Sequence, residues 1–131
     1  MYFYSYANSN KEAKEQAQWV LKQIKEYDLT LPVVFDWECY SSFNTMELSL
    51  FGLNSIAESF LSEIKEKGYD TMIYASKNYL NAIWTYQQED VWLAHYTEKT
   101  DYEGEYKMWQ LCSDGKIDGI STDVDIDILY K

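Results

Sequence analysis

Hydrophobic and polar positions along the chain alternate between two spacings, which predicts strands separated by helices. Apolar residues at helical spacing follow Ser9, which forms the pattern of a capping box with Glu12. A longer apolar stripe follows Asn44 and Thr45, either of which can cap a helix, and it ends at Gly68. Short apolar or alternating runs predict strands at residues 2–7, 31–38, 71–76, 91–96, 106–112 and 124–129, with a short helical piece at 78–84.

This order of elements predicts the fold class. Strands separated by helices indicate a parallel sheet with helices outside, either a barrel or an open wound sheet. The later helices are short or missing, which favours an α/β fold with an incomplete, irregular TIM-like β/α barrel of mostly parallel strands. Residues 1–131 show no linker or repeat, so we expect one domain. In either fold the chemistry is expected at the carboxyl ends of the strands.

Composition narrows the class of protein. The chain is 47% hydrophobic, as in a globular domain, and its net charge of −11 argues against nucleic acid and anionic membranes as partners. No apolar run approaches the roughly 20 residues of a membrane helix, and no signal peptide opens the chain. Aromatic residues make up 18%, which suits either a core or a groove for sugar rings. Composition alone leaves both open.

The cysteines and the histidine predict no metal site. Cys39 and Cys112 lie far apart, without metal-ligand spacing or a disulfide framework, and are expected to be buried free thiols. His95 is the one histidine, and we interpret it as structural.

The most informative segment ends the second predicted strand with Asp36-Trp37-Glu38. Because side chains alternate along a strand, Asp36 and Glu38 point the same way, while Phe35 and Trp37 point toward the helices. The two acids are about 6.6 Å apart along the strand, and like charges this close raise one pKa. A carboxylic acid protonated near neutral pH is what cleavage of a glycosidic bond needs. The alternative is a strand end whose carboxylates cap a helix or pair with lysine.

The segment 31–38, Leu-Pro-Val-Val-Phe-Asp-Trp-Glu, resembles the middle of the family 25 glycoside hydrolases, the Chalaropsis-type muramidases or lysozymes. Each motif is short, and the ordered set is specific. Further segments resemble this family in order and at matching spacing: 3–7, 68–69 with 73–76, 91–96, 108–111, and 119–120 with 124–127.

The resemblance implies a peptidoglycan hydrolase that cleaves the β-1,4 bond from N-acetylmuramic acid to N-acetylglucosamine. It implies that Glu38 donates a proton, that Asp36 orients the substrate's own N-acetyl group, and that Asp125 supports the site. Asp125 can equally be a turn carboxylate. No metal or organic cofactor is implied, and an active muramidase would work outside the cell or in the wall. Both carboxylates are expected to open onto a cleft rimmed by Trp and Tyr. The rings expected to contact sugar, each also partly in the core, are Tyr74, Trp92, Tyr96 and Trp109.

One feature departs from the family pattern, because nothing matches its opening Asp-containing strand. We therefore expect a partial domain, either a fragment or a natural short form, with low activity alone. An uncovered barrel edge favours a homo-oligomer that assembles through that edge. The alternatives are an inactive remnant that binds wall glycan or only self-associates, and a different hydrolase. The chain shows neither a nucleophile elbow nor a phosphate loop.

Overall fold

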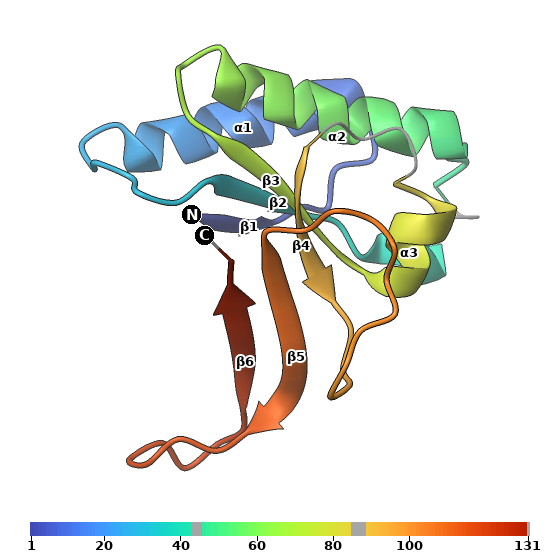
Figure 1. Cartoon of the computed structure of the whole chain (residues 1–131). Coiled ribbons are helices and arrows are strands. Elements are labelled where there is room, and N and C mark those ends of the chain that lie inside the picture. The colour runs from blue at the N-terminus through green and yellow to red at the C-terminus, as the bar shows by residue number, and fades with distance from the viewer. Residues whose placement is uncertain (43–45, 85–88, 131) are drawn as a thin grey trace.

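The computed structural model describes residues 1–42, 46–84 and 89–130, which form one curled sheet with helices packed on its outer face (Figure 1). The first five strands run parallel, and the last pairs antiparallel with the fifth. The predicted α/β fold, an incomplete barrel with mostly parallel strands, is confirmed. The strands, in sheet order, are β1 (Tyr2–Tyr4), β2 (Val33–Asp36), β3 (Thr71–Ser76), β4 (Asp90–Ala94), β5 (Met108–Gly115) and β6 (Val124–Leu129).

Several predicted strand ends are wrong. The first strand ends at Tyr4 rather than at residue 7, because Ser5 Oγ accepts a hydrogen bond from the Ala7 amide and turns the chain away. β2 spans four residues of the predicted eight, and β4 ends at Ala94 rather than at residue 96. β5 runs from residue 108 to 115 instead of 106 to 112, because its pairing with β6 extends through two irregularities in register. The bounds of β3 and β6 are as predicted.

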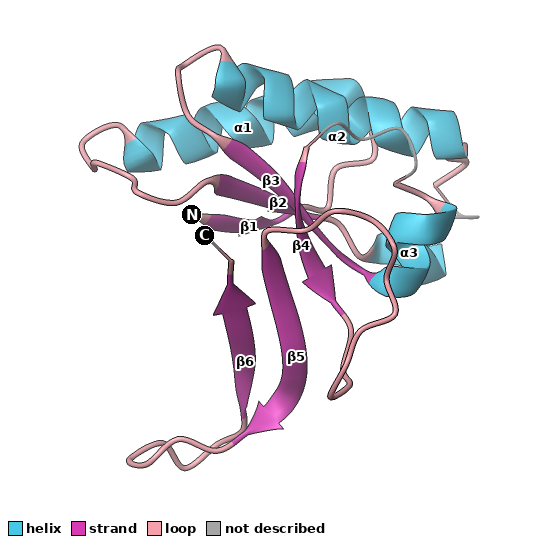
Figure 2. Cartoon of the chain, viewed as in Figure 1, coloured by secondary structure: helices cyan, strands magenta, loops and turns pink. Residues whose placement is uncertain are grey.

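Helices α1 (Asn10–Ile24) and α2 (Leu50–Lys65) lie side by side over β1 to β3 (Figure 2). Ser9 Oγ accepts from the Glu12 amide as predicted, but the Glu12 carboxylate accepts from the Asn8 amide rather than from Ser9, so the capping box is not reciprocal. A third helix, α3 (Lys77–Ala82), follows β3 directly.

The start of α2 differs from the prediction. The expected caps Asn44 and Thr45 lie outside the described residues, and the helix begins at Leu50, where Ser49 Oγ accepts from the Gly52 amide at 2.9 Å. Leu50 was expected in the apolar stripe of this helix but is 49% exposed. Gly68, at φ 86°, ends the segment as predicted, in a conformation that favours glycine.

The main core lies between the two long helices and the outer face of the sheet. Phe35 and Trp37 of the β2 segment are fully buried there against Phe60 of α2 and the small residues of α1. Burial of large apolar side chains of this kind stabilises the fold by about 1.5–3 kcal/mol each. In the described part of the chain, no helix has the length and apolarity to cross a membrane. Cys39 and Cys112 are free thiols, but both are half-buried rather than fully buried as expected.

The inner face of the sheet carries a smaller aromatic cluster. The rings of Tyr2, Tyr74 and Trp92 meet edge to face, with centroids 5.3 to 5.9 Å apart. Because β1 and β4 are separated by two strands, direct contact between Tyr2 and Trp92 requires strong curvature of the sheet. Edge-to-face pairs add about 0.5–1.5 kcal/mol each beyond area burial. The aromatic cluster therefore fills the inside of the bend.

β1 forms one edge of this sheet. Met1 and Ser5 hydrogen-bond to β2, through Met1 O and Ser5 N, and backbone groups alternate in direction along a strand. Tyr2 and Tyr4 therefore turn their backbone N–H and C=O groups away from β2. Trp19 of α1 packs beside this edge and is 52% exposed. A free edge flanked by exposed aromatic side chains is a surface that promotes strand pairing.

We expect two copies to associate through antiparallel pairing of their β1 strands. Tyr4→Pro removes an amide that points away from β2, so it should abolish the dimer while keeping the fold. Tyr4→Ala, the matched control, loses the same ring but keeps the amide and should still dimerise. Sedimentation velocity at micromolar concentration measures both, and a monomeric unaltered chain would contradict the prediction.

Candidate active site

The two predicted carboxylates lie at the carboxyl end of β2, on the inner face of the sheet. Asp36 is the last residue of the strand and has no exposed surface. Its Oδ2 accepts a hydrogen bond from the Tyr2 hydroxyl, while Oδ1 is buried without a hydrogen-bond partner in the described part of the chain. Both carboxylates were expected to open onto a cleft rimmed by aromatic rings. Glu38 alone does so, because the inner aromatic cluster covers Asp36.

The environment of Asp36 favours its protonated form. Burial raises the pKa of Asp36 to about 7, the hydrogen bond from Tyr2 opposes this rise, and the negative charge of Glu38 adds to it. A carboxyl group inside a protein loses the hydration that stabilises its anion, and the single hydroxyl replaces only part of it. Asp36 therefore changes its charge near neutral pH.

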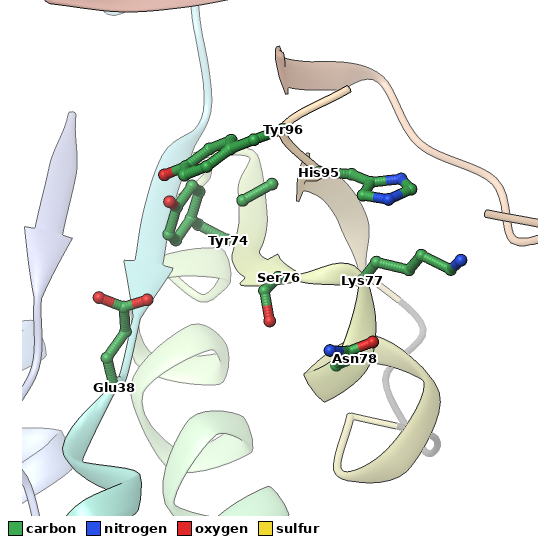
Figure 3. A pocket seen from close by; sticks show the side chains of 8 residues that line it. Glu38, Tyr74, Ser76, Lys77, Asn78, His95 and Tyr96 are labelled. Atoms are coloured by element: carbon green, nitrogen blue, oxygen red, sulfur yellow. The ribbon is translucent and has the colours of Figure 1, made fainter. Parts of the chain in front are cut away.

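Glu38 lies two residues beyond Asp36 and lines a pocket of about 290 Å³. The pocket lies between the end of β2, the start of α3 and the end of β4, and Figure 3 shows the Glu38 carboxylate on the same side as the hydroxyls of Tyr74 and Tyr96. Partial burial raises the pKa of Glu38. Of the two acids, Glu38 is therefore the one whose proton can reach a bound molecule.

Tyr74 and Tyr96 form one wall of this pocket. Tyr74 projects inward from β3 and is nearly buried, whereas Tyr96, two residues past β4, is 56% exposed. Both hydroxyls donate to the side-chain oxygen of Gln110, at 2.7 and 2.9 Å. The two predicted sugar-contacting tyrosines are thus brought together beside Glu38.

The opposite side of the pocket carries His95 and Lys77, which extend away from Glu38 in Figure 3. His95 Nδ1 lies 2.8 Å from Thr100 Oγ1 and 3.7 Å from Asp101 Oδ1. Lys77 Nζ donates to the same carboxylate at 2.5 Å. These contacts fix the loop after β4 to the start of α3. They agree with a structural role for His95, although its ring lines the pocket.

The remaining predicted site residues lie elsewhere. Trp109 belongs to the outer core, where its indole N–H donates to the His95 carbonyl at 2.9 Å. Trp92 faces inward and donates to Asp127 Oδ1 at 2.8 Å, which ties β4 to β6 across β5. Asp125 is exposed on β6, and its charge acts on Asp127, whose pKa is raised chiefly by burial. Trp109 and Asp125 are therefore not part of the pocket wall around Glu38.

A paired carboxylate at a strand end, set beside tyrosines in a curled parallel sheet, is the arrangement the sequence resemblance implied. The family model for glycosyl hydrolases family 25 matches residues 1–120. The chain belongs to glycosyl hydrolases family 25. No curated protein matches it at the sequence level.

Solved structures of a spore cortex lytic enzyme and of two family 25 glycosyl hydrolases share the fold. SleM, a spore cortex lytic enzyme of Clostridium perfringens, superposes with a TM-score of 0.77 at 19% identity, covering 96% of this chain and 47% of that chain. GHIP, a glycosyl hydrolase 25 of Streptococcus pneumoniae, superposes with a TM-score of 0.77 at 21% identity, covering 98% of this chain and 57% of that chain. A family 25 glycosyl hydrolase from Bacillus anthracis superposes with a TM-score of 0.78 at 20% identity, covering 99% of this chain and 63% of that chain. The chain thus spans about half to two thirds of the length of these structures.

Two site residues of this family 25 chain were missed from its sequence. Tyr2, which bonds Asp36, is 34 residues away from it along the chain, and only strand order brings the two together. Gln110 follows Trp109 in the 108–111 segment that resembles the family, but only Trp109 was predicted to contact substrate. The signal that identifies Gln110 is alternation, because its neighbour Trp109 faces the helices and Gln110 must therefore face the pocket side.

The raised pKa of Asp36 predicts a pH-dependent stability. Between its unfolded pKa near 3.8 and about 7, the folded chain binds more protons, so the free energy of unfolding falls as pH rises through this range. Relative to Asp36→Asn, the unaltered chain should lose on the order of 4 kcal/mol between pH 4 and pH 8. Tyr2→Phe removes the hydrogen bond that opposes the raised pKa of Asp36, so the fall in the free energy of unfolding should continue above pH 7.

Urea unfolding of the three proteins at pH 4, 6 and 8 measures this difference. Since Asp36→Asn shares every other titrating group with the unaltered chain, those groups cancel in the comparison. A stability difference that stays constant with pH would show that Asp36 is ionised throughout, and the assignment of a buried neutral carboxyl would then be wrong.

Proposed function

We propose that this chain hydrolyses the glycan strands of peptidoglycan as an N-acetylmuramidase, cleaving the β-1,4 bond from N-acetylmuramic acid to N-acetylglucosamine. The observation that carries the proposal is Glu38, a carboxyl with a raised pKa in a tyrosine-lined pocket at the carboxyl end of β2. Its neighbour Asp36 shares the same face, and the chain belongs to a glycosidase family. The structural relative SleM is a spore cortex lytic enzyme, which agrees with a wall substrate.

In this mechanism Glu38 protonates the leaving oxygen as the glycosidic bond breaks. Asp36 accepts the N–H of the substrate's acetamido group through its unpartnered Oδ1 and holds that group as its oxygen attacks the anomeric carbon. Such participation by the substrate replaces a protein nucleophile. Access to Asp36 requires the Tyr2 side chain to move aside, and Tyr2 is at the edge of the sheet and 45% exposed.

A second candidate is a protein that binds wall glycan without cleaving it. The observation that favours it is the complete burial of Asp36 behind the Tyr2 hydroxyl. A carboxylate held in this way cannot orient a substrate unless Tyr2 moves. Glu38 and the exposed face of Tyr96 remain able to contact a sugar in either case.

The Glu38→Gln substitution separates the two candidates. General acid catalysis contributes about 10²–10⁴-fold, so the loss of turbidity of purified peptidoglycan should slow by at least about 100-fold. Glu58→Gln, an exposed carboxylate of α2 remote from the pocket, is the matched control and should leave the rate unchanged.

Co-sedimentation with insoluble peptidoglycan is measured on the same proteins. Binding that persists in the unaltered chain without any turbidity loss supports the binding protein and rejects hydrolysis. Hydrolysis that survives Glu38→Gln would remove Glu38 from the role of proton donor. Absence of both binding and hydrolysis would reject both candidates.

A further inference from the structure

Gln110 stands behind both tyrosines of the pocket. It lies on the inner face of β5 and is almost fully buried. Its Oε1 accepts from the hydroxyls of Tyr74 and Tyr96, at 2.7 and 2.9 Å. The three residues come from β3, β5 and the segment just after β4. One buried oxygen therefore fixes the direction of two hydroxyl groups from different parts of the sheet.

These two hydrogen bonds decide whether this wall of the pocket donates or accepts hydrogen bonds. A tyrosine hydroxyl has a single proton to donate and lone pairs that accept. The two hydroxyls also hydrogen-bond each other, so both protons are held among Tyr74, Tyr96 and Gln110, and the two oxygens offer only lone pairs to the pocket. A wall of this kind binds groups that carry hydrogen, such as a sugar hydroxyl, an amide N–H or a protonated carboxyl, and offers nothing to an anion.

Glu38 is the ionisable group whose charge depends on whether this wall donates hydrogen bonds. It lines the pocket together with both tyrosines (Figure 3). Burial raises the pKa of Tyr74, and the charge and hydrogen bond of Tyr96 add to this rise. The charges of Glu38 and Asp36 raise it further, so Glu38 is near enough to interact. A tyrosine free to rotate would turn its proton toward an ionised Glu38 and stabilise the anion.

We propose that Gln110 is a positioning residue that holds the hydroxyl protons of Tyr74 and Tyr96 away from Glu38, so that this wall of the pocket only accepts hydrogen bonds. The protonated form of Glu38 is then favoured without any contact between Gln110 and Glu38. This role deepens the proposed function and rests on it only for its catalytic consequence, because the proton on Glu38 is the one transferred in hydrolysis.

The test is the pKa of Glu38 in Gln110→Met, a variant of similar shape that accepts no comparable hydrogen bond. The carboxyl carbon of Glu38 is titrated by NMR in protein labelled with ¹³C, and Glu38→Gln assigns its signal. Released hydroxyls can donate to the carboxylate, so its pKa should fall by about one pH unit. In the Tyr74→Phe/Tyr96→Phe background, the same Gln110→Met substitution should produce no shift.

Each other outcome overturns the proposal. An unchanged pKa means that the hydroxyl protons do not respond to Gln110. An equal fall in both backgrounds means that Gln110 acts through packing or its own dipole. A rise in pKa means that the amide nitrogen, rather than Oε1, faces the tyrosines.

A second measurement needs no variant and serves if Gln110→Met does not fold. In the unaltered chain, nuclear Overhauser effects from the tyrosine hydroxyl protons should reach the Gln110 side-chain amide and not the Glu38 methylenes; the reverse pattern overturns the proposal. Neither measurement requires enzymatic activity. An inactive chain would therefore reject the proposed hydrolysis, while the positioning role of Gln110 would still be tested. In an active chain, the alkaline limb of the pH–rate profile should shift to lower pH in Gln110→Met.

Discussion

The two-residue period of side chains along β2 is the constraint on which the rest of the structure depends. Phe35 and Trp37 are fully buried on the outer face, and the indole N–H of Trp37 donates to the Ala7 carbonyl at 2.9 Å. A slip of one residue would place Asp36 in the apolar core beneath the helices and expose Phe35, which costs several kcal/mol on both faces. The packing of α1 and α2 therefore sets the position of Glu38, although neither helix contributes a residue to its pocket.

The curvature of the sheet connects stability to chemistry. Contacts among Tyr2, Tyr74 and Trp92 fill the inside of the bend and also remove water from Asp36. The buried Oδ1 of Asp36, without a partner in the described part of the chain, costs about 1–3 kcal/mol. The Tyr2 hydroxyl offsets part of the penalty at Oδ2. An atom left unpaired at such a cost is typical of a site shaped for a bound molecule rather than for stability.

The fold could be predicted from the sequence where local patterns coincide with burial. β3 and β6 have the predicted bounds. The β3 run is buried from Thr71 to Ala75, and apolar and acidic residues alternate along most of β6. The start of α2 could not be predicted, since Asn44, Thr45 and Ser49 are all good caps and only tertiary packing selects among them. The outward direction of Trp109 and the bond from Tyr2 to Asp36 depend on register between strands, which no local pattern specifies.

The two acids also differ in a way that composition and spacing could not reveal. Repulsion between Asp36 and Glu38 is mutual, and in the free chain the more deeply buried Asp36 has the pKa near 7. Under the proposed mechanism, an acetamido N–H bonded to Oδ1 stabilises ionised Asp36, since a hydrogen bond to the charged form lowers a carboxyl pKa. The negative charge that then forms beside Glu38 raises the pKa of Glu38. Substrate binding would thereby move a proton from Asp36 to Glu38 in the pocket. There the hydroxyls of Tyr74 and Tyr96, held by Gln110, donate no hydrogen bond that would favour ionised Glu38 instead.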